Sequence, residues 1–190
     1  TAELLKGKKP AGSNIEKVAC TIGPGSFTGI RIGLTFARCL CQYNSIPLAG
    51  IKTHAALAQR VNLFLRNPLY YKEGEIAVCP VIPASMNEIY VSLFSIRHWR
   101  ASAQSRLAPR EIFSCRILSM ENFKKYLLNV KKQKSKQRLI VTGDWTLKNK
   151  EFLKNSGINE NDIIENDSML SIAAAVSSLA APVKERNYSK

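Results

Sequence analysis

The 190-residue sequence has few of the residues that build metal sites or disulfide frameworks. It contains two histidines and an odd number of cysteines, five, with no Cys-x-x-Cys pair among them. Cys39 and Cys41 would point about 200° apart on a helix. We therefore expect no zinc site and no disulfides, but small buried thiols in a reducing compartment, the cytoplasm by default. These residues are Cys20, Cys39, Cys41, Cys79 and Cys115.

Long apolar runs are also missing. The longest, such as Ile76–Ile82 and Ile172–Val176, fall well short of the roughly 20 residues that a membrane-spanning helix needs, so we expect no membrane span. Because 45% of the residues are hydrophobic, the chain can still bury a core of one or two domains. The first residues form no signal-peptide pattern and include no initiator Met, which indicates an internal fragment of a longer chain.

Acidic residues are scarce relative to basic ones. Lys and Arg number 28 against 14 Asp and Glu, a net charge of +14, which favours an anionic partner such as nucleic acid. Residues 121–150 hold nine of the basic residues and two acidic ones. This stretch is either a nucleic-acid contact or a solvated basic face. The candidate contacts are Lys131, Lys132, Lys134 and Lys136, with Trp99, Tyr126 or Trp145 available to stack on bases.

The first part of the chain has an α/β pattern. Lys17–Ile22 is typical of a buried strand, and a glycine-rich turn separates it from a helix predicted over Ile30–Tyr43. A second strand is predicted at Ile46–Gly50, followed by a helix that Thr53 can cap. A strand–helix–strand unit of this length predicts a parallel pair of strands. The helix over Ile30–Tyr43 has two apolar stripes and is expected to be mostly buried.

Turn residues near 67–74 place a boundary between an N-terminal lobe, 1–72, and a C-terminal α/β lobe, 73–190. Ile76–Ile82 and Glu88–Phe94 predict a hairpin. The remaining predicted elements are a strand at Phe113–Leu118, a helix at Met120–Val130, a strand at Arg138–Thr142, and helices at Leu147–Lys154 and Ser168–Leu179. The last of these helices could return to the first lobe.

The turn between the first strand and helix contains Gly23, Gly25 and Gly29. Such a loop could cradle a phosphate at the helix N-terminus. However, it lacks the lysine of a P-loop, and its spacing matches neither the dinucleotide motif nor the hydrolase nucleophile elbow. We therefore interpret it as a structural connector in which Ser26 or Thr28 caps the helix and Phe27 packs.

The segment 23–38, GPGSFTGIRIGLTFAR, resembles the signature of the TsaB (YeaZ-like) family. Weaker similarity covers Thr1–Leu5, Met86–Tyr90 and Val141–Asp144. The chain departs from the family pattern at Pro83 and Ser85, where an Asp and an Arg are usual. The resemblance implies an actin-like ATPase (RNase H-like) fold of two lobes, with the opening strands of the first lobe missing.

The resemblance also implies a function. TsaB-like proteins are scaffolds for TsaD, which transfers threonylcarbamoyl to the tRNA adenosine next to the anticodon, while TsaE supplies ATPase action. TsaD-like enzymes bind a metal through two histidines whose places here are Thr53 and Leu57, and the nearby His54 stands alone as a helix-face residue. We therefore expect a non-catalytic subunit with neither metal nor cofactor.

The expected partner surface is helical, formed with TsaD or, without it, with a second copy. Its candidate residues are Leu4, Leu5, Arg31, Leu34, Thr35, Arg38 and Gln42. Two alternatives remain: a module that binds tRNA directly through its basic surface, and an ATP-binding enzyme or peptidase of the same superfold. The missing metal pair and phosphate loop count against the second alternative.

Overall fold

The structure, a computed structural model, describes residues 15–66, 74–98, 108–134, 137–164 and 171–181. The segment containing Leu4 and Leu5, the expected boundary at 67–73, Trp99 and Lys136 lie outside the described residues. In the part that is described, no helix is both long enough and apolar enough to cross a membrane.

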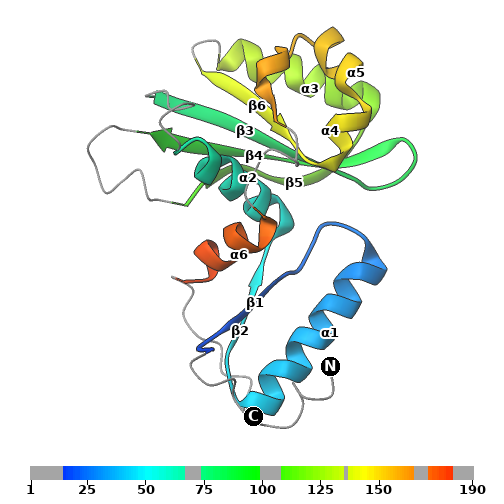
Figure 1. The fold of residues 1–190 in the computed structure, drawn as a ribbon. Coiled ribbons are helices and arrows are strands. Elements are labelled where there is room, and N and C mark those ends of the chain that lie inside the picture. Colours follow the sequence, from blue (N-terminus) through cyan, green and yellow to red (C-terminus); the bar gives the residue numbers. More distant parts are fainter. Residues whose placement is uncertain (1–14, 67–73, 99–107, 135–136, 165–170, 182–190) are drawn as a thin grey trace.

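A strand–helix–strand unit opens the described fold, as predicted. Strand β1 (Val18–Thr21) pairs in parallel with β2 (Leu48–Ile51), in a register that sets Val18 against Leu48 and Thr21 against Ile51. Between them runs helix α1 (Phe27–Asn44), which begins three residues before the predicted start. Figure 1 shows α1 covering one face of this two-stranded sheet.

The second sheet has five strands in the order β5-β4-β3-β6-β7. The predicted hairpin is confirmed: β3 and β4 pair antiparallel, and β5 continues the meander. Strand β6 pairs in parallel with β3, and β7 pairs in parallel with β6. Their bounds are Gly74–Pro83 for β3, Glu88–His98 for β4, Arg110–Ser119 for β5, Arg138–Thr142 for β6 and Ile163–Ile164 for β7.

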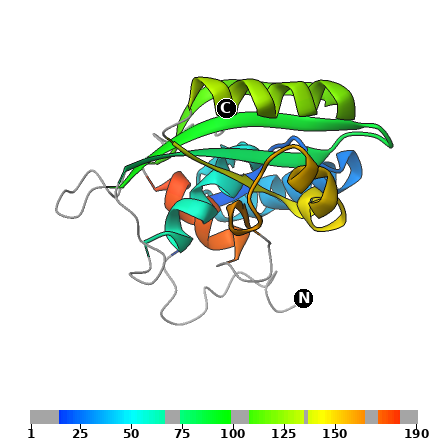
Figure 2. The same ribbon diagram turned by 90° about the horizontal axis from the view of Figure 1, so that it is seen from above.

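Three helices cover one face of the large sheet. Helix α3 (Met120–Gln133) runs along the long strands (Figure 2). The helix predicted over Leu147–Lys154 is wrong, because two short helices, α4 (Asp144–Lys148) and α5 (Lys150–Asn155), meet at Asn149. There the backbone leaves the helical region with φ −128°, and the Asn149 amide side chain donates to the Trp145 carbonyl. A short 3₁₀ turn, η2 (Glu160–Asp162), precedes β7.

Two helices lie between the sheets, so the layers alternate from α3–α5 through the large sheet to α2 and α6, then β1–β2, then α1 (Figure 1). Helix α2 (Thr53–Phe64) packs on the large sheet through Ala58, Val61 and its C-cap residue Leu65. Helix α6 (Ile172–Ala180) packs on the small sheet. Thr53 is not the cap that was expected: the cap position is Lys52, without a side-chain bond, and the Thr53 amide donates to the Gly23 carbonyl instead.

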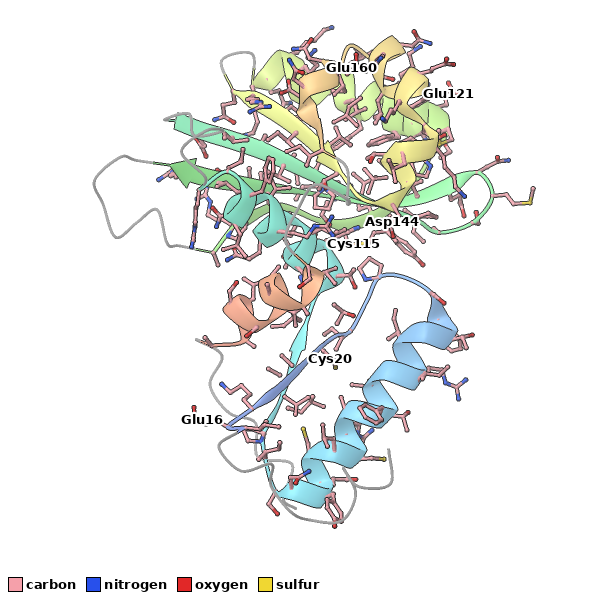
Figure 3. The ribbon with its side chains drawn as sticks, in the orientation of Figure 1. Glu16, Cys20, Cys115, Glu121, Asp144 and Glu160 are labelled. Carbon is pink, nitrogen blue, oxygen red and sulfur yellow. The ribbon has the colours of Figure 1, made fainter. Side chains whose placement is uncertain are left out.

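The expectation of five buried cysteines is wrong for three of them. Cys41 and Cys79 are buried, Cys20 on β1 is partly buried, and Cys39 and Cys115 are exposed. Cys39 lies on the side of α1 that faces away from the small sheet, and Cys115 lies on β5, the edge strand of the large sheet (Figure 3). A side chain on an edge strand or on the outer side of a surface helix is covered by neighbouring residues on one side only.

Candidate partner-binding surface

The glycine loop fixes where α1 begins. Gly23 and Gly25 have φ values of 106° and 154°, which favour glycine. The Gly23 carbonyl accepts a hydrogen bond of 2.8 Å from the Thr53 amide, which ties the loop to the start of α2. A Cβ atom at Gly23 would lie 3.3 Å from the Ile30 side chain. The loop therefore holds α1 at a set position against α2.

Ser26 is the residue that caps α1, the first of the two predicted alternatives. Its hydroxyl accepts from the Gly29 amide at 3.3 Å, and its carbonyl accepts from the Ile30 amide at 2.9 Å. The first of these bonds occupies the Gly29 amide, one of the N-terminal amides that a bound phosphate would need. The geometry accordingly favours a connector over an anion site.

Replacing the cap residue should loosen the start of α1. We expect Ser26→Ala to lower the free energy of unfolding by about 1 kcal/mol, because the Gly29 amide loses its acceptor. Thr28→Ala is the matched control, since Thr28 lies inside the first turn and is not the cap. Urea denaturation followed by circular dichroism measures both. Equal losses for the two variants would contradict the assigned cap.

The expectation that most of α1 is buried is wrong. Ala37 and Cys41 are buried against the small sheet, but Ile32 and Phe36 are 66% and 69% exposed. Phe27, which was expected to pack, is 74% exposed, and the Arg31 guanidinium lies over its ring at 5.3 Å from the centroid. A two-stranded sheet covers only one side of a helix, so the second apolar stripe faces outward.

This outward face forms a shallow groove, which we call the α1 groove. Its residues recur every three or four positions, as one helix face requires. They are Thr28, Arg31, Ile32, Thr35, Phe36 and Cys39. Exposed apolar side chains framed by polar ones are typical of a surface that binds another protein.

Of the described residues that were predicted to bind a partner, four are exposed and one is partly buried. Arg31 and Thr35 line the α1 groove, and Arg38 and Gln42 are exposed beside it. Leu34 is partly buried on the inner side of the helix. Sequence reasoning missed Ile32 and Phe36, because it assigned both apolar stripes to the core. The sequence feature that could have identified them is the width of the apolar surface of the helix, which is larger than a two-stranded sheet can cover.

His54 lies on α2, as predicted, and its side chain is buried. Its Nδ1 lies 2.5 Å from the Ser92 hydroxyl, and burial lowers its pKa to about 4. The neighbouring Cys115 thiol has a pKa raised by burial. Within the described ranges no group of three or more His, Cys, Asp or Glu side chains could hold a metal ion. Thr53 and Leu57 supply no imidazole to complement His54.

The basic side chains of residues 121–150 are less available to a nucleic acid than the composition of this stretch indicates. The Lys131 ammonium donates to the Gly157 carbonyl, and that of Lys134 donates to the Gln137 side chain at 2.9 Å, while Lys132 is exposed. Acidic partners balance other residues of the stretch, since Arg138 pairs with Asp162 at 2.5 Å. Internal contacts therefore occupy part of the expected nucleic-acid surface.

The prediction that aromatic residues stack on bases is wrong for two of them, because their rings pack in or against the core. Trp145 is 9% exposed and packs edge-on against Phe123 and Phe152, with ring centroids 5.7 and 5.8 Å away. Tyr126 packs on Phe113 at 5.3 Å, and burial raises its pKa. Trp145 belongs to the core of the large sheet, and Tyr126 is partly buried against that core.

Residues 1–163 match the family model described as "TsaD: tRNA N6-adenosine threonylcarbamoyltransferase". The tRNA threonylcarbamoyladenosine biosynthesis protein TsaB of Escherichia coli is 35% identical over 88 residues, 46% of this chain and 35% of that protein. The protein of the same name from Haemophilus influenzae is 30% identical over 119 residues, 63% of this chain and 47% of that protein.

The chain spans from 35% to 47% of the length of these two relatives. Among solved structures, an uncharacterized protein with similarity to peptidase YEAZ from Pseudomonas aeruginosa has a TM-score of 0.57 at 19% identity. That alignment covers 90% of this chain and 69% of the other. It confirms the predicted two-lobed α/β fold of the actin-like, RNase H-like type. The chain belongs to the family that the TsaD model describes, within which its curated relatives carry the name TsaB.

Proposed function

We propose that this chain is a scaffold or regulatory subunit in the biosynthesis of tRNA threonylcarbamoyladenosine. It binds a TsaD-like catalytic subunit through the α1 groove, in an assembly that also uses a TsaE-like ATPase and meets tRNA indirectly or weakly. The names of its relatives support the pathway. The observation that carries the binding role is the outward exposure of Ile32 and Phe36 on a helix whose position is fixed.

The groove supports binding on energetic grounds. Burying a side chain such as Ile or Phe contributes about 1.5–3 kcal/mol, and α1 presents two of them side by side. The helix is held by the Ser26 cap and the Gly23–Thr53 hydrogen bond, so little order has to be gained on binding. Preorganised apolar anchors of this kind dominate the energy of protein interfaces.

The surroundings of His54 support a non-catalytic role. His54, the one histidine near the places of the family's metal ligands, is buried against Ser92, and its lowered pKa keeps it neutral at pH 7. Among the residues that the structure describes, it belongs to no group of three or more potential metal ligands. In this proposal the catalytic subunit performs the chemistry, and this chain supplies the surface that holds it.

The test is a double substitution at the centre of the groove. Ile32→Asp/Phe36→Asp should weaken binding to the TsaD-like subunit of the same organism at least about tenfold, because two carboxylates would have to be desolvated. Isothermal titration measures the affinity. In cells depleted of the native chain, the variant should fail to restore threonylcarbamoyladenosine, as quantified by mass spectrometry of tRNA nucleosides.

Leu128→Asp is the matched control, because Leu128 is an exposed apolar residue on α3, away from the α1 groove. It should leave both the affinity and the modification level unchanged. Undiminished binding and full rescue by the Ile32/Phe36 variant would refute the proposed surface. Loss of rescue by both variants would instead point to a general defect of folding.

A further inference from the structure

One end of the large sheet brings together basic side chains from distant parts of the sequence. Strand β4 ends there, β3, β5 and β6 begin there, and α3 leads into β6 at the same end (Figure 1). Arg97 of β4 pairs with Glu75 of β3. Arg110 of β5 pairs with Ser95 of β4. Together with Lys134, which follows α3 directly, these two arginines form what we call the basic end.

A hydrogen-bond network around Glu75 fixes the basic end. The Glu75 carboxylate accepts hydrogen bonds from the Ser95 hydroxyl and, at 2.9 Å, from the side-chain amide of Gln137. The side-chain oxygen of Gln137 accepts in turn from the Lys134 ammonium at 2.9 Å. The Arg97 guanidinium lies 3.9 Å from the same Glu75 carboxylate. Lys134 and Arg97 are therefore held next to one carboxylate before any ligand binds.

Positive charge at this end of the sheet exceeds what Glu75 can neutralise. The Ser95 hydrogen bond lowers the pKa of Glu75, and the charges of the basic end lower it further against the opposing effect of burial. The carboxylate is therefore ionised at neutral pH, and three cations beside one carboxylate leave a net charge of +2. Two nearby carboxylates pair with other cations and leave this excess in place: Asp162 pairs with Arg138, and Glu111 with Lys52.

The arrangement of the three cations favours a polyanion over a single anion. Neighbouring strands lie about 4.8 Å apart, so Arg110 on β5, Arg97 on β4 and Lys134 beside β3 form a row about 10 Å long. A nucleic-acid strand carries its charges at regular intervals and meets several such cations at once. Two of the three cations are arginines, whose planar guanidinium groups bind phosphate oxygens in pairs.

We infer that the basic end contacts the phosphate backbone of an RNA directly. The sequence indicated a run of lysines beginning at Lys131, but the fold joins Lys134 of this run to two arginines from other strands. The identity of the RNA as tRNA rests on the proposed function. The contact itself does not depend on the α1 groove, because its residues belong to the large sheet and to the end of α3.

The test measures binding of the wild-type chain to an unmodified, fluorescently labelled tRNA transcript by fluorescence anisotropy. The affinity should fall about 20-fold between about 50 and 200 mM salt, as three phosphate contacts require. Arg97→Gln/Arg110→Gln should weaken binding at least about tenfold at the lower salt concentration and should reduce the slope of log affinity against log salt by about two. Arg97→Lys/Arg110→Lys keeps both charges and should retain more affinity than the glutamine variant.

Lys124→Gln/Lys148→Gln is the matched control, because it removes the same charge from exposed positions on α3 and α4. It should weaken tRNA binding less than about threefold, since its charges lie outside the basic end. The affinity of the Arg97→Gln/Arg110→Gln variant for the TsaD-like subunit should equal that of the wild type by isothermal titration. This second measurement shows that the variant is folded.

Each outcome decides a different question. An equal loss of tRNA affinity in the two glutamine variants overturns the inference, because the attraction is then a general effect of net charge. Poly-glutamate or phosphatidylserine vesicles that compete as well as unlabelled tRNA also overturn it, in favour of an acidic protein or a membrane surface. Binding to the TsaD-like subunit without affinity for tRNA refutes the inference alone. Binding to tRNA through the basic end without affinity for that subunit refutes the proposed function and supports the inference.

Discussion

Gly143→Ala is expected to lower the free energy of unfolding by about 4 kcal/mol, enough to unfold a large fraction of a marginally stable domain. Gly143 follows β6 and precedes α4 with φ 129°, where L side chains are strained. A Cβ atom there would lie 2.1 Å from the carbonyl oxygen of Val81 in β3. Because the obstacle is backbone in the middle of a five-stranded sheet, no side-chain rotation relieves it.

Urea denaturation with circular dichroism measures this loss, and Gly33→Ala is the matched control. A Cβ atom at Gly33 in α1 meets no atom of the described residues within 4 Å. Removing a glycine from a helix interior should raise stability by about 0.5–1 kcal/mol. Similar behaviour of the two variants would contradict the close approach of Gly143 to Val81.

Stability should also fall in acid as His54 becomes charged. Burial lowers the folded-state pKa of His54 to about 4, below the ordinary value of 6.5, while the backbone of Tyr90 and the carboxylate of Glu111 act in the opposite direction. The unfolded state therefore binds the proton first as the pH drops. The stabilisation is complete above about pH 6.5 and is lost between there and pH 4, a change of about 3 kcal/mol.

The measurement is the free energy of unfolding at a series of pH values from 7 to 5, where about 2 kcal/mol of this change should appear. His54→Gln is the control, because an amide retains hydrogen-bonding capacity toward Ser92 and does not titrate. Its stability should vary far less over the same range. A wild-type profile that is flat between pH 7 and 5 would show that His54 is not buried as described.

Most of the elements were predictable because their sequence signals are local. The β-rich apolar runs of β3 and β4, the turn between them and the apolar run of β6 depend on side chains next to one another. Boundaries were less predictable. The predicted helix at Leu147–Lys154 ignored the break at Asn149, where the side chain of that residue bonds to the Trp145 carbonyl.

The candidate site was only half predictable, because its exposure depends on what the fold leaves uncovered. Periodicity identified the polar stripe that contains Arg31 and Arg38, but it could not show which apolar stripe meets the sheet. Ile32 and Ala37 are both apolar, yet one is exposed and the other buried. The position of α1 relative to two short strands decides this, and that position arises from contacts distant in sequence.

The packing of α6 on β1–β2 has a consequence for how the protein is made. Val176 and Ala180 share a cluster with Ala49 and Ile51, and the Lys17 ammonium donates to the Ala180 carbonyl at 3.4 Å. Contacts that span most of the chain close slowly and late. During synthesis, β1 and β2 therefore leave the ribosome without the helix that covers them, and their apolar face stays exposed until α6, far later in the sequence, has been made.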